Sequence, residues 1–311
     1  MRAVRYIESG IRVVDVPAPS GPGVRVRVRS ASVCGSDLHL LGQVQGVTLG
    51  HEIAGITPDG SPVAIEPLSP CLGCEQCQLG SYHLCVEAKA MIHGVGRDGG
   101  MADEILVPER ALVPLPNAVA LADACLVEPL AVVVHGIRRS GLRAGDRVAV
   151  IGGGPLGLCA IPVLRAFGAG EVALIARHDT QRAAGERLGA VPAKSGHYDL
   201  VIEAAGSQSA FAQAVETVRP HGKIAVIGTY WDPIQIPGFE LAMKEADLSM
   251  SVLYSGAAPH RDVDRAAALL AATPELPRAV ITHRFPLDAA REAFAMAADR
   301  KAGAIKVVLE P

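Results

Sequence analysis

Residues 146–180, DRVAVIGGGPLGLCAIPVLRAFGAGEVALIARHDT, contain an apolar run, a glycine-rich turn, a long apolar segment and a second apolar run. This order predicts a strand, a tight turn, a helix and a second strand, the unit from which doubly wound parallel sheets are built. The turn has the spacing Gly152-x-Gly154-x-x-Gly157, with Pro155 and Leu156 inside it. Between a strand and a helix, this spacing lets the backbone approach a pyrophosphate at the helix N-terminus. We therefore expect a dinucleotide-binding site formed by these five residues; a turn that is merely tight is the plainer alternative.

The end of the second predicted strand bears on which dinucleotide is bound. An acidic residue about twenty positions after the glycines usually binds the ribose hydroxyls of NAD. Here that position is Ala176, followed by Arg177. A missing carboxylate removes repulsion against a 2′-phosphate, and a guanidinium can bind one through two hydrogen bonds. This favours NADP over NAD, unless Arg177 is a solvated strand end and Asp179 supplies the acid.

Similar units continue on the C-terminal side, with YDLVIEAAG, a helix and GKIAVIG. Residues 1–115 differ, because they consist of short alternating runs broken by Gly and Pro. Within them, Arg25, Arg27 and Arg29 alternate with Val, as in an antiparallel strand with one face in solvent. The fold class is therefore α/β, with a strand-rich part and a doubly wound part.

A second cluster of unusual residues is CLGCEQCQLGSYHLC, which places Cys71, Cys74, Cys77 and Cys85 within fifteen residues. A disulfide knot is disfavoured, since the chain has seven cysteines and no signal-peptide pattern. An iron–sulfur cluster of the bacterial ferredoxin type expects its fourth cysteine after three residues and before a proline. A closed tetrahedral zinc site with a structural role is the better interpretation.

Composition limits the possible partners. The formal net charge is −3 and a fifth of the residues are charged, which is not the footprint of a nucleic-acid or anionic-membrane binder. No apolar run approaches the length needed to span a bilayer. We expect a cytoplasmic protein that binds neither nucleic acid nor membrane.

A third constellation lies in SVCGSDLHL and LGHEIAG, which contain Cys34, His51 and Glu52, and in LVEPL, which contains Glu128. Together these side chains offer a mixed set of sulfur, nitrogen and oxygen ligands. Mixed sets with fewer than four fixed ligands are typical of catalytic zinc, which keeps a position for water or substrate.

These motifs, in this order, resemble the zinc-dependent medium-chain alcohol dehydrogenases. Glu128-Pro129-Leu130 is most similar to the branch of polyol, sorbitol and threonine dehydrogenases, and GGMAD and ITHRFPL extend the match along nearly the whole chain. The resemblance implies a GroES-like catalytic domain over 1–138 and 277–311, with a structural zinc lobe at 71–85. A Rossmann domain would occupy 139–276.

The resemblance also implies roles for individual residues. Cys34 and His51 would bind zinc, with Glu52 and Glu128 as variable ligands, Ser36 touching the substrate hydroxyl and His39 passing its proton outward. The expected reaction is hydride transfer between a secondary alcohol of a polyol, sugar or cyclitol and NADP. Reduction of small ketones or aldehydes, or a non-catalytic NADP-binding role, are the alternatives. Relatives associate through the edge of the Rossmann sheet, which implies a homodimer or homotetramer.

One departure concerns the loops. Eleven residues separate His39 from His51, fewer than is usual in the family, and the whole chain is short. Because such loops line the substrate cleft, the resemblance does not predict the shape of the pocket.

Overall fold

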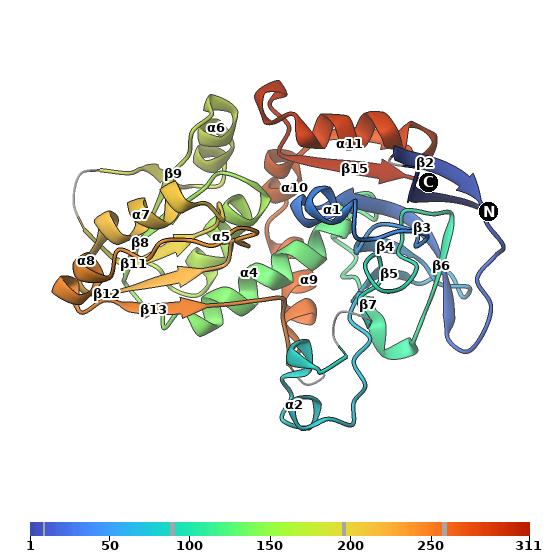
Figure 1. The fold of residues 1–311 in the computed structure, drawn as a ribbon, viewed down its shortest axis with the longest axis horizontal. Helices are drawn as coiled ribbons and strands as arrows, with labels where there is room; N and C mark the ends of the chain where they lie inside the picture. Colours follow the sequence, from blue (N-terminus) through green and yellow to red (C-terminus); the bar gives the residue numbers. More distant parts are fainter. Residues whose placement is uncertain (9, 88–90, 195–196, 257–259) are drawn as a thin grey trace. The chain divides into compact units, whose positions relative to one another are not determined.

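The computed structural model describes all residues of the 311-residue chain except 9, 88–90, 195–196 and 257–259 (Figure 1). The described chain divides into two compact units, which we describe separately. The first comprises Met1–Glu128, Ser255–Pro277 and Ile281–Pro311, and the second comprises Pro129–Tyr254 and Arg278–Val280. No helix in the described part of the chain is both long enough and apolar enough to cross a membrane.

The first unit is rich in strands and short helical turns. Its elements are β1 (Arg2–Ile7), β2 (Gly10–Asp15), β3 (Val24–Val33), α1 (Gly35–Leu40), β4 (Glu52–Ile56), β5 (Pro62–Ile65), α2 (Glu75–Gln78), η1 (Tyr82–Leu84), β6 (Glu104–Val107), η2 (Glu109–Ala111), β7 (Leu112–Pro114), η3 (Ala124–Leu126), α9 (Asp262–Ala272), the first half of α10 (Glu275–Val280), β14 (Ile281–Pro286), η4 (Leu287–Ala289), α11 (Ala290–Ala298), η5 (Arg300–Ala302) and β15 (Lys306–Glu310).

A seven-stranded sheet organises this unit in the order β14-β15-β3-β4-β5-β7, with β6 also paired to β3. Strand β3 shows why these residues form a half-buried strand, since Val26 and Val28 are buried while Arg25 and Arg27 are exposed. This confirms the alternation expected for an antiparallel strand with one wet face. The buried side chains join one apolar core with those of β4, β5, β15 and α11.

The second unit alternates strands with helices. Its first helix, α4, begins with the last two residues of the segment Met1–Glu128 of the first unit and continues into the second unit. Its elements are α4 (Val127–Arg139), β8 (Arg147–Ile151), α5 (Pro155–Ala166), β9 (Glu171–Ile175), α6 (Asp179–Arg187), β10 (Val191–Pro192), β11 (Tyr198–Glu203), α7 (Gln208–Thr217), β12 (Val218–Val226), α8 (Gly238–Lys244) and β13 (Asp247–Met250).

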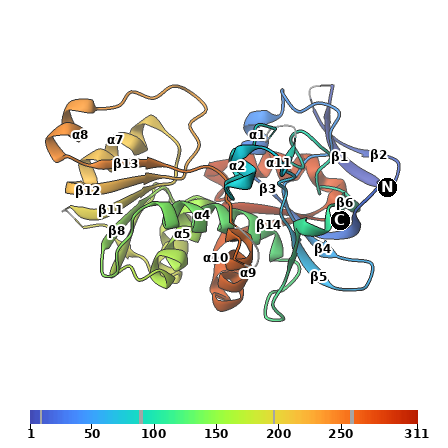
Figure 2. The same ribbon diagram turned by 90° about the horizontal axis from the view of Figure 1, so that it is seen from below.

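The strands of the second unit form one parallel sheet in the order β10-β9-β8-β11-β12-β13. Figure 2 shows α4 and α5 on one face of this sheet and α7 on the other. Because both faces are covered at the centre of the sheet, the central strand β8 is a continuous apolar run from Val148 to Ile151 rather than an alternating one. The doubly wound α/β class expected from the sequence is confirmed.

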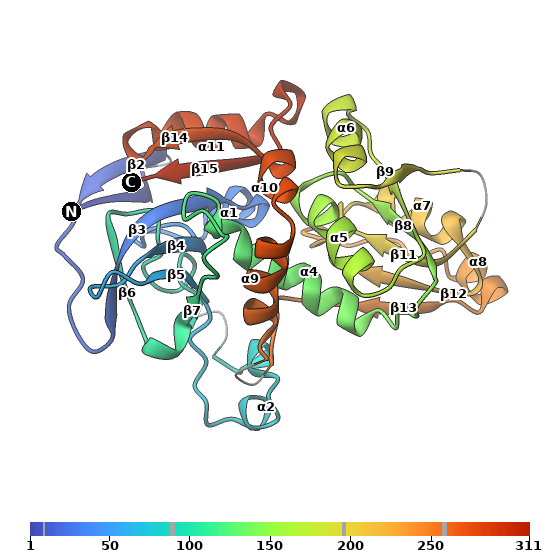
Figure 3. The ribbon, with the colours of Figure 1, turned by 180° about the vertical axis from the view of Figure 1, so that it is seen from behind.

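The lobe that carries the four clustered cysteines projects from the first unit and contains α2 and η1 (Figure 3). Polar contacts attach its base to the sheet. The Tyr82 hydroxyl donates to the buried Glu66 carboxylate at the end of β5. Arg261, just before α9, donates to the same carboxylate at 2.9 Å and to the backbone carbonyl of Arg110 at 2.6 Å. Breaking one partner of such a buried pair is costly, so these contacts hold the base of the lobe in place.

The boundaries of the units can be compared with the expected domains. Residues 255–277 belong to the first unit by their contacts, whereas the resemblance assigns 139–276 to the Rossmann domain. Helix α9 contacts β7 and η3 of the first unit. The expected domain boundaries remain a prediction.

Candidate metal and dinucleotide sites

Three of the predicted zinc ligands come together in the first unit. The ligand atoms of Cys34, His51 and Glu52 all lie within 4.8 Å of one another. Cys34 follows β3 directly and precedes α1, while His51 precedes and Glu52 begins β4, which pairs with β3. The pairing of these adjacent antiparallel strands thus brings Cys34 and His51, seventeen positions apart in the sequence, close together.

Glu52 is held by two neighbours that the motif analysis did not identify. The Lys306 ammonium donates to both carboxylate oxygens at 2.7 Å, and the Ser32 hydroxyl donates to the same carboxylate. Burial lowers the pKa of Lys306, but the Glu52 carboxylate outweighs burial and leaves that pKa above its ordinary value. The sequence signal for this contact is the single lysine in the apolar strand IKVVL.

His51 lies beside a second carboxylate. Its Nδ1 atom is 3.2 Å from Asp37, and its Nε2 atom is 3.4 Å from the Ser36 hydroxyl. Burial lowers the pKa of His51, but Asp37 and Cys34 raise it well above its ordinary value. Surroundings that favour a protonated imidazole also favour a divalent cation, so this donor set fits zinc. Asp37 is placed to orient the ring of His51.

Two further predicted residues lie outside this cluster. Glu128 is buried in the first turn of α4, but the ligand atoms grouped within 4.8 Å do not include its carboxylate. His39 is exposed in the last turn of α1. Their proposed roles remain predictions from the resemblance.

The four cysteines of the lobe form a second cluster. All are free thiols, with Sγ–Sγ distances of 3.5 Å for Cys74–Cys77 and Cys71–Cys85 and 3.9 Å for Cys71–Cys77. Zinc–sulfur bonds of about 2.3 Å in a tetrahedron require sulfurs about 3.8 Å apart, whereas a disulfide requires about 2.05 Å. The cluster therefore fits a zinc ion without rearrangement. Backbone N–H groups of Val86 and Cys77 lower the pKa of Cys74 to about 6, which favours the thiolate that zinc binds.

The glycine turn of the second unit connects β8 to α5. A side chain at Gly157 would place its Cβ atom 1.8 Å from the carbonyl oxygen of Gly152, so packing requires glycine there. Gly152 itself has a φ of 108°, which favours glycine. Gly154 is different, because its φ is −74° and a Cβ atom would meet nothing within 4 Å. Neither backbone nor packing explains that glycine, whereas close approach of a ligand would.

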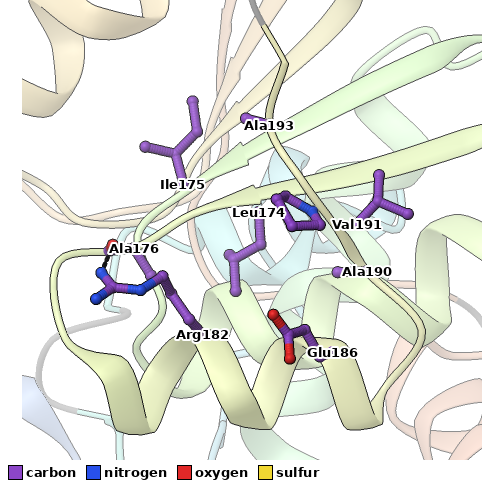
Figure 4. Close-up of a pocket in the computed structure, with 9 residues that line it drawn as sticks. Leu174, Ile175, Ala176, Arg182, Glu186, Ala190, Val191 and Ala193 are labelled. Carbon is purple, nitrogen blue, oxygen red and sulfur yellow. Dashed lines mark hydrogen bonds between the residues drawn. The ribbon is translucent and has the colours of Figure 1, made fainter.

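The carboxyl end of β9 lies near this turn. A Cβ atom on Gly153 would come within 2.8 Å of the Ala176 side chain. Arg177 is exposed and donates to the Ser209 hydroxyl at 2.7 Å, and Arg182 donates to the backbone carbonyl of Ala176 (Figure 4). Motif reading missed Ser209 and Arg182, since only the fold brings them to the end of β9.

The difference between Gly154 and Gly157 can be tested by substitution. Gly154→Ala is expected to leave the free energy of unfolding unchanged and to weaken dinucleotide binding about tenfold. Gly157→Ala is expected to lower the free energy of unfolding by about 3 kcal/mol, because its Cβ atom meets backbone. Urea unfolding and calorimetric titration of the nucleotide measure the two effects. Equal destabilisation by both variants would contradict the assignment of Gly154 to ligand approach.

Zinc binding by each of the two clusters can also be tested by substitution. The wild-type chain is expected to bind two zinc ions, measured by elemental analysis of dialysed protein. Cys34→Ser is expected to lose the ion of the mixed cluster, and Cys77→Ser the ion of the lobe, so that each variant retains one. Cys159→Ser, at a buried cysteine outside both clusters, is the control and should retain both. A wild-type content of one ion would mean that one of the clusters does not bind zinc.

Comparisons with known proteins agree with this geometry. Residues 21–117 match the family model described as an alcohol dehydrogenase GroES-like domain, and residues 155–272 match the model of a zinc-binding dehydrogenase. The chain is 33% identical to an L-arabinitol 4-dehydrogenase of Aspergillus oryzae, over 92% of this chain and 86% of the relative. It is 30% identical to a 2-dehydro-3-deoxy-L-galactonate 5-dehydrogenase of Pseudoalteromonas atlantica, over 87% of each chain.

A solved structure agrees as well. A zinc-binding dehydrogenase from Sinorhizobium meliloti, bound to NADP, is 30% identical and superposes with a TM-score of 0.87 over 100% of this chain and 99% of its own. The matched models, the relatives and the two metal clusters lead to one conclusion: the chain belongs to the zinc-dependent medium-chain alcohol dehydrogenases and is an oxidoreductase of their polyol dehydrogenase branch.

Proposed function

We propose that this enzyme transfers hydride reversibly between NADP and a secondary alcohol in a polyol, sugar or cyclitol. The observation that carries the proposal is the position of the Ser36 hydroxyl, 3.4 Å from His51 within the mixed ligand cluster. The relatives named above act on a sugar alcohol and on a sugar acid, which supports this substrate class.

The residues of the cluster support a division of tasks. Cys34 and His51, with Glu52, would hold a zinc ion, which would supply the Lewis acidity that lowers the pKa of a bound alcohol. The Ser36 hydroxyl, 3.4 Å from the Nε2 atom of His51, would accept a hydrogen bond from the substrate hydroxyl and relay its proton by passing its own proton on. His39, exposed on α1, passes the proton outward. A dinucleotide held at the glycine turn would supply the nicotinamide that accepts hydride from the substrate carbon.

The preference for NADP is supported by charge at the end of β9. Ala176 leaves no carboxylate where NAD enzymes hold the ribose hydroxyls, and the Arg177 guanidinium lies next to it. The Sinorhizobium meliloti structure carries NADP, which supports the same preference.

Nicotinamide absorbance tests the reaction directly. Purified enzyme is expected to turn over at least one member of a panel of polyols, sugars and cyclitols, faster with NADP than with NAD. Ser36→Ala is expected to lower kcat by about 10²–10⁴-fold, since one proton-transfer group is removed. Ser20→Ala, at an exposed serine between β2 and β3, is the control. A clear preference for NAD, or unchanged kcat in the Ser36 variant, would contradict the proposal.

We further propose that the enzyme is a homodimer or a homotetramer built on a dimer, formed through the β13 edge of the second unit. Strand β13 pairs with β12, and no other strand in the described chain pairs with its outer side. Seven of the twelve exposed large hydrophobic side chains of the described residues lie between 231 and 252. Phe239 and Met243 on α8 are 76% and 70% exposed, which leaves an apolar surface for a second copy to cover.

Charge on this surface tests the assembly. Phe239→Glu combined with Met243→Glu is expected to reduce the mass measured by light scattering to that of a smaller species, because two charges would be buried per subunit. Val86→Glu, at an equally exposed apolar residue of the first unit, is the control and should leave the mass unchanged. A wild-type monomer, or a double variant of unchanged mass, would contradict this interface.

A further inference from the structure

The segment from Ala176 to Arg182, which leads from the end of β9 into the first turn of α6, contains one carboxylate and two guanidinium groups. Asp179 is the only acidic residue from Ala176 to Arg182. It is the residue that could replace the missing acid at Ala176, because it follows three positions later at the start of α6. A carboxylate at that place would accept the ribose 2′-hydroxyl of NAD and repel the 2′-phosphate of NADP.

Arg182 engages this carboxylate. Its Nη2 atom forms an ion pair with Asp179, and its Nη1 atom donates to the backbone carbonyls of Ala176 and Arg177, both at 2.9 Å. Figure 4 shows Arg182 reaching from α6 to Ala176 beside a hollow of about 270 Å³ that both residues line. An exposed ion pair alone is weak. Here the two carbonyl contacts fix the guanidinium independently, so the carboxylate meets a cation that is already in place.

Arg177 is held separately. Its Nη2 atom donates to Ser209 at 2.7 Å, at the start of α7, and no ion pair in the described chain joins it to Asp179. The two arginines therefore have different partners. Arg182 neutralises the Asp179 carboxylate. Arg177 keeps its positive charge and has further N–H groups that can donate to a ligand.

We propose that Arg182 is a positioning residue that sets the cofactor preference through Asp179. It withdraws the carboxylate from the ribose, so that the 2′-phosphate meets the charge of Arg177 without an opposing anion. This inference rests on the proposed use of NADP and adds the residue that maintains it.

The test uses two nucleotides that differ only in the group of interest, adenosine 2′,5′-bisphosphate and adenosine 5′-phosphate. Calorimetric titration of the whole enzyme gives the ratio of their affinities. Arg182→Gln is expected to lower this preference for the 2′-phosphate about fivefold, the effect of one like charge at close range in water. Asp179→Asn alone should change it little. Arg182→Gln with Asp179→Asn should restore the ratio, because the freed carboxylate is gone.

Two controls separate this role from a structural one. Arg187→Gln removes the same charge from the same helix and should leave the ratio unchanged. Arg182→Lys keeps the cation beside Asp179 while losing the two-pronged contact, and should keep most of the preference. If Arg182 only held the turn through its carbonyl contacts, the lysine variant and the double variant would both lose the preference.

The outcomes also separate this inference from the proposed function. A wild-type enzyme that binds the two nucleotides equally would contradict NADP preference, and this inference with it. A wild-type preference for the bisphosphate that persists in Arg182→Gln, or that the double variant fails to restore, would overturn the role of Arg182 alone.

Discussion

The buried ion pair between Glu52 and Lys306 is the constraint on which the first unit depends. It joins Glu52 at the start of strand β4, directly after the zinc-ligand candidate His51, to β15 near the end of the chain, and both side chains are almost fully inaccessible. Burial of the Glu52 carboxylate beside Cys34 and His51 costs folding free energy unless a cation pairs with it. The Lys306 ammonium of the same chain is that cation. The C-terminal strand is therefore part of the metal centre as well as of the sheet.

The two clusters of metal-binding side chains differ in their ligands and in their surroundings, and each suits a different role. The cysteine lobe has little apolar core, so its four thiolates suit a closed site whose role is to hold the loop. The mixed cluster is built on the sheet itself, where adjacent strands already fix its members. Its donors are fewer and lie beside the Ser36 hydroxyl, which contacts His51 and is a group that a reaction needs and a structural site does not.

At the end of β9, the three-dimensional contacts of the charged side chains, and not their number in the sequence, decide which charges neutralise one another. Between Ala176 and Arg182 the chain holds two arginines and one aspartate, a set that by itself is compatible with either cofactor. Arg177 donates to Ser209, whereas Arg182 forms the ion pair with Asp179, so the two cations have different partners. The same residues with the partners exchanged would present a carboxylate to the ribose.

Local pattern alone was enough for the fold class, and it singled out the glycine turn, the four cysteines of the lobe, and Cys34, His51 and Glu52, whose ligand atoms the structure groups together. Strand and helix periodicity, glycine spacing and clustered cysteines are set by neighbours in the chain, and the structure bears out the α/β class they predict. Other features depended on tertiary structure: the pairing of Lys306 with Glu52, the contact of Arg177 with Ser209, and the separation of Glu128 from the mixed cluster. These involve side chains up to 254 positions apart, which only the pairing of strands and the packing of helices bring together.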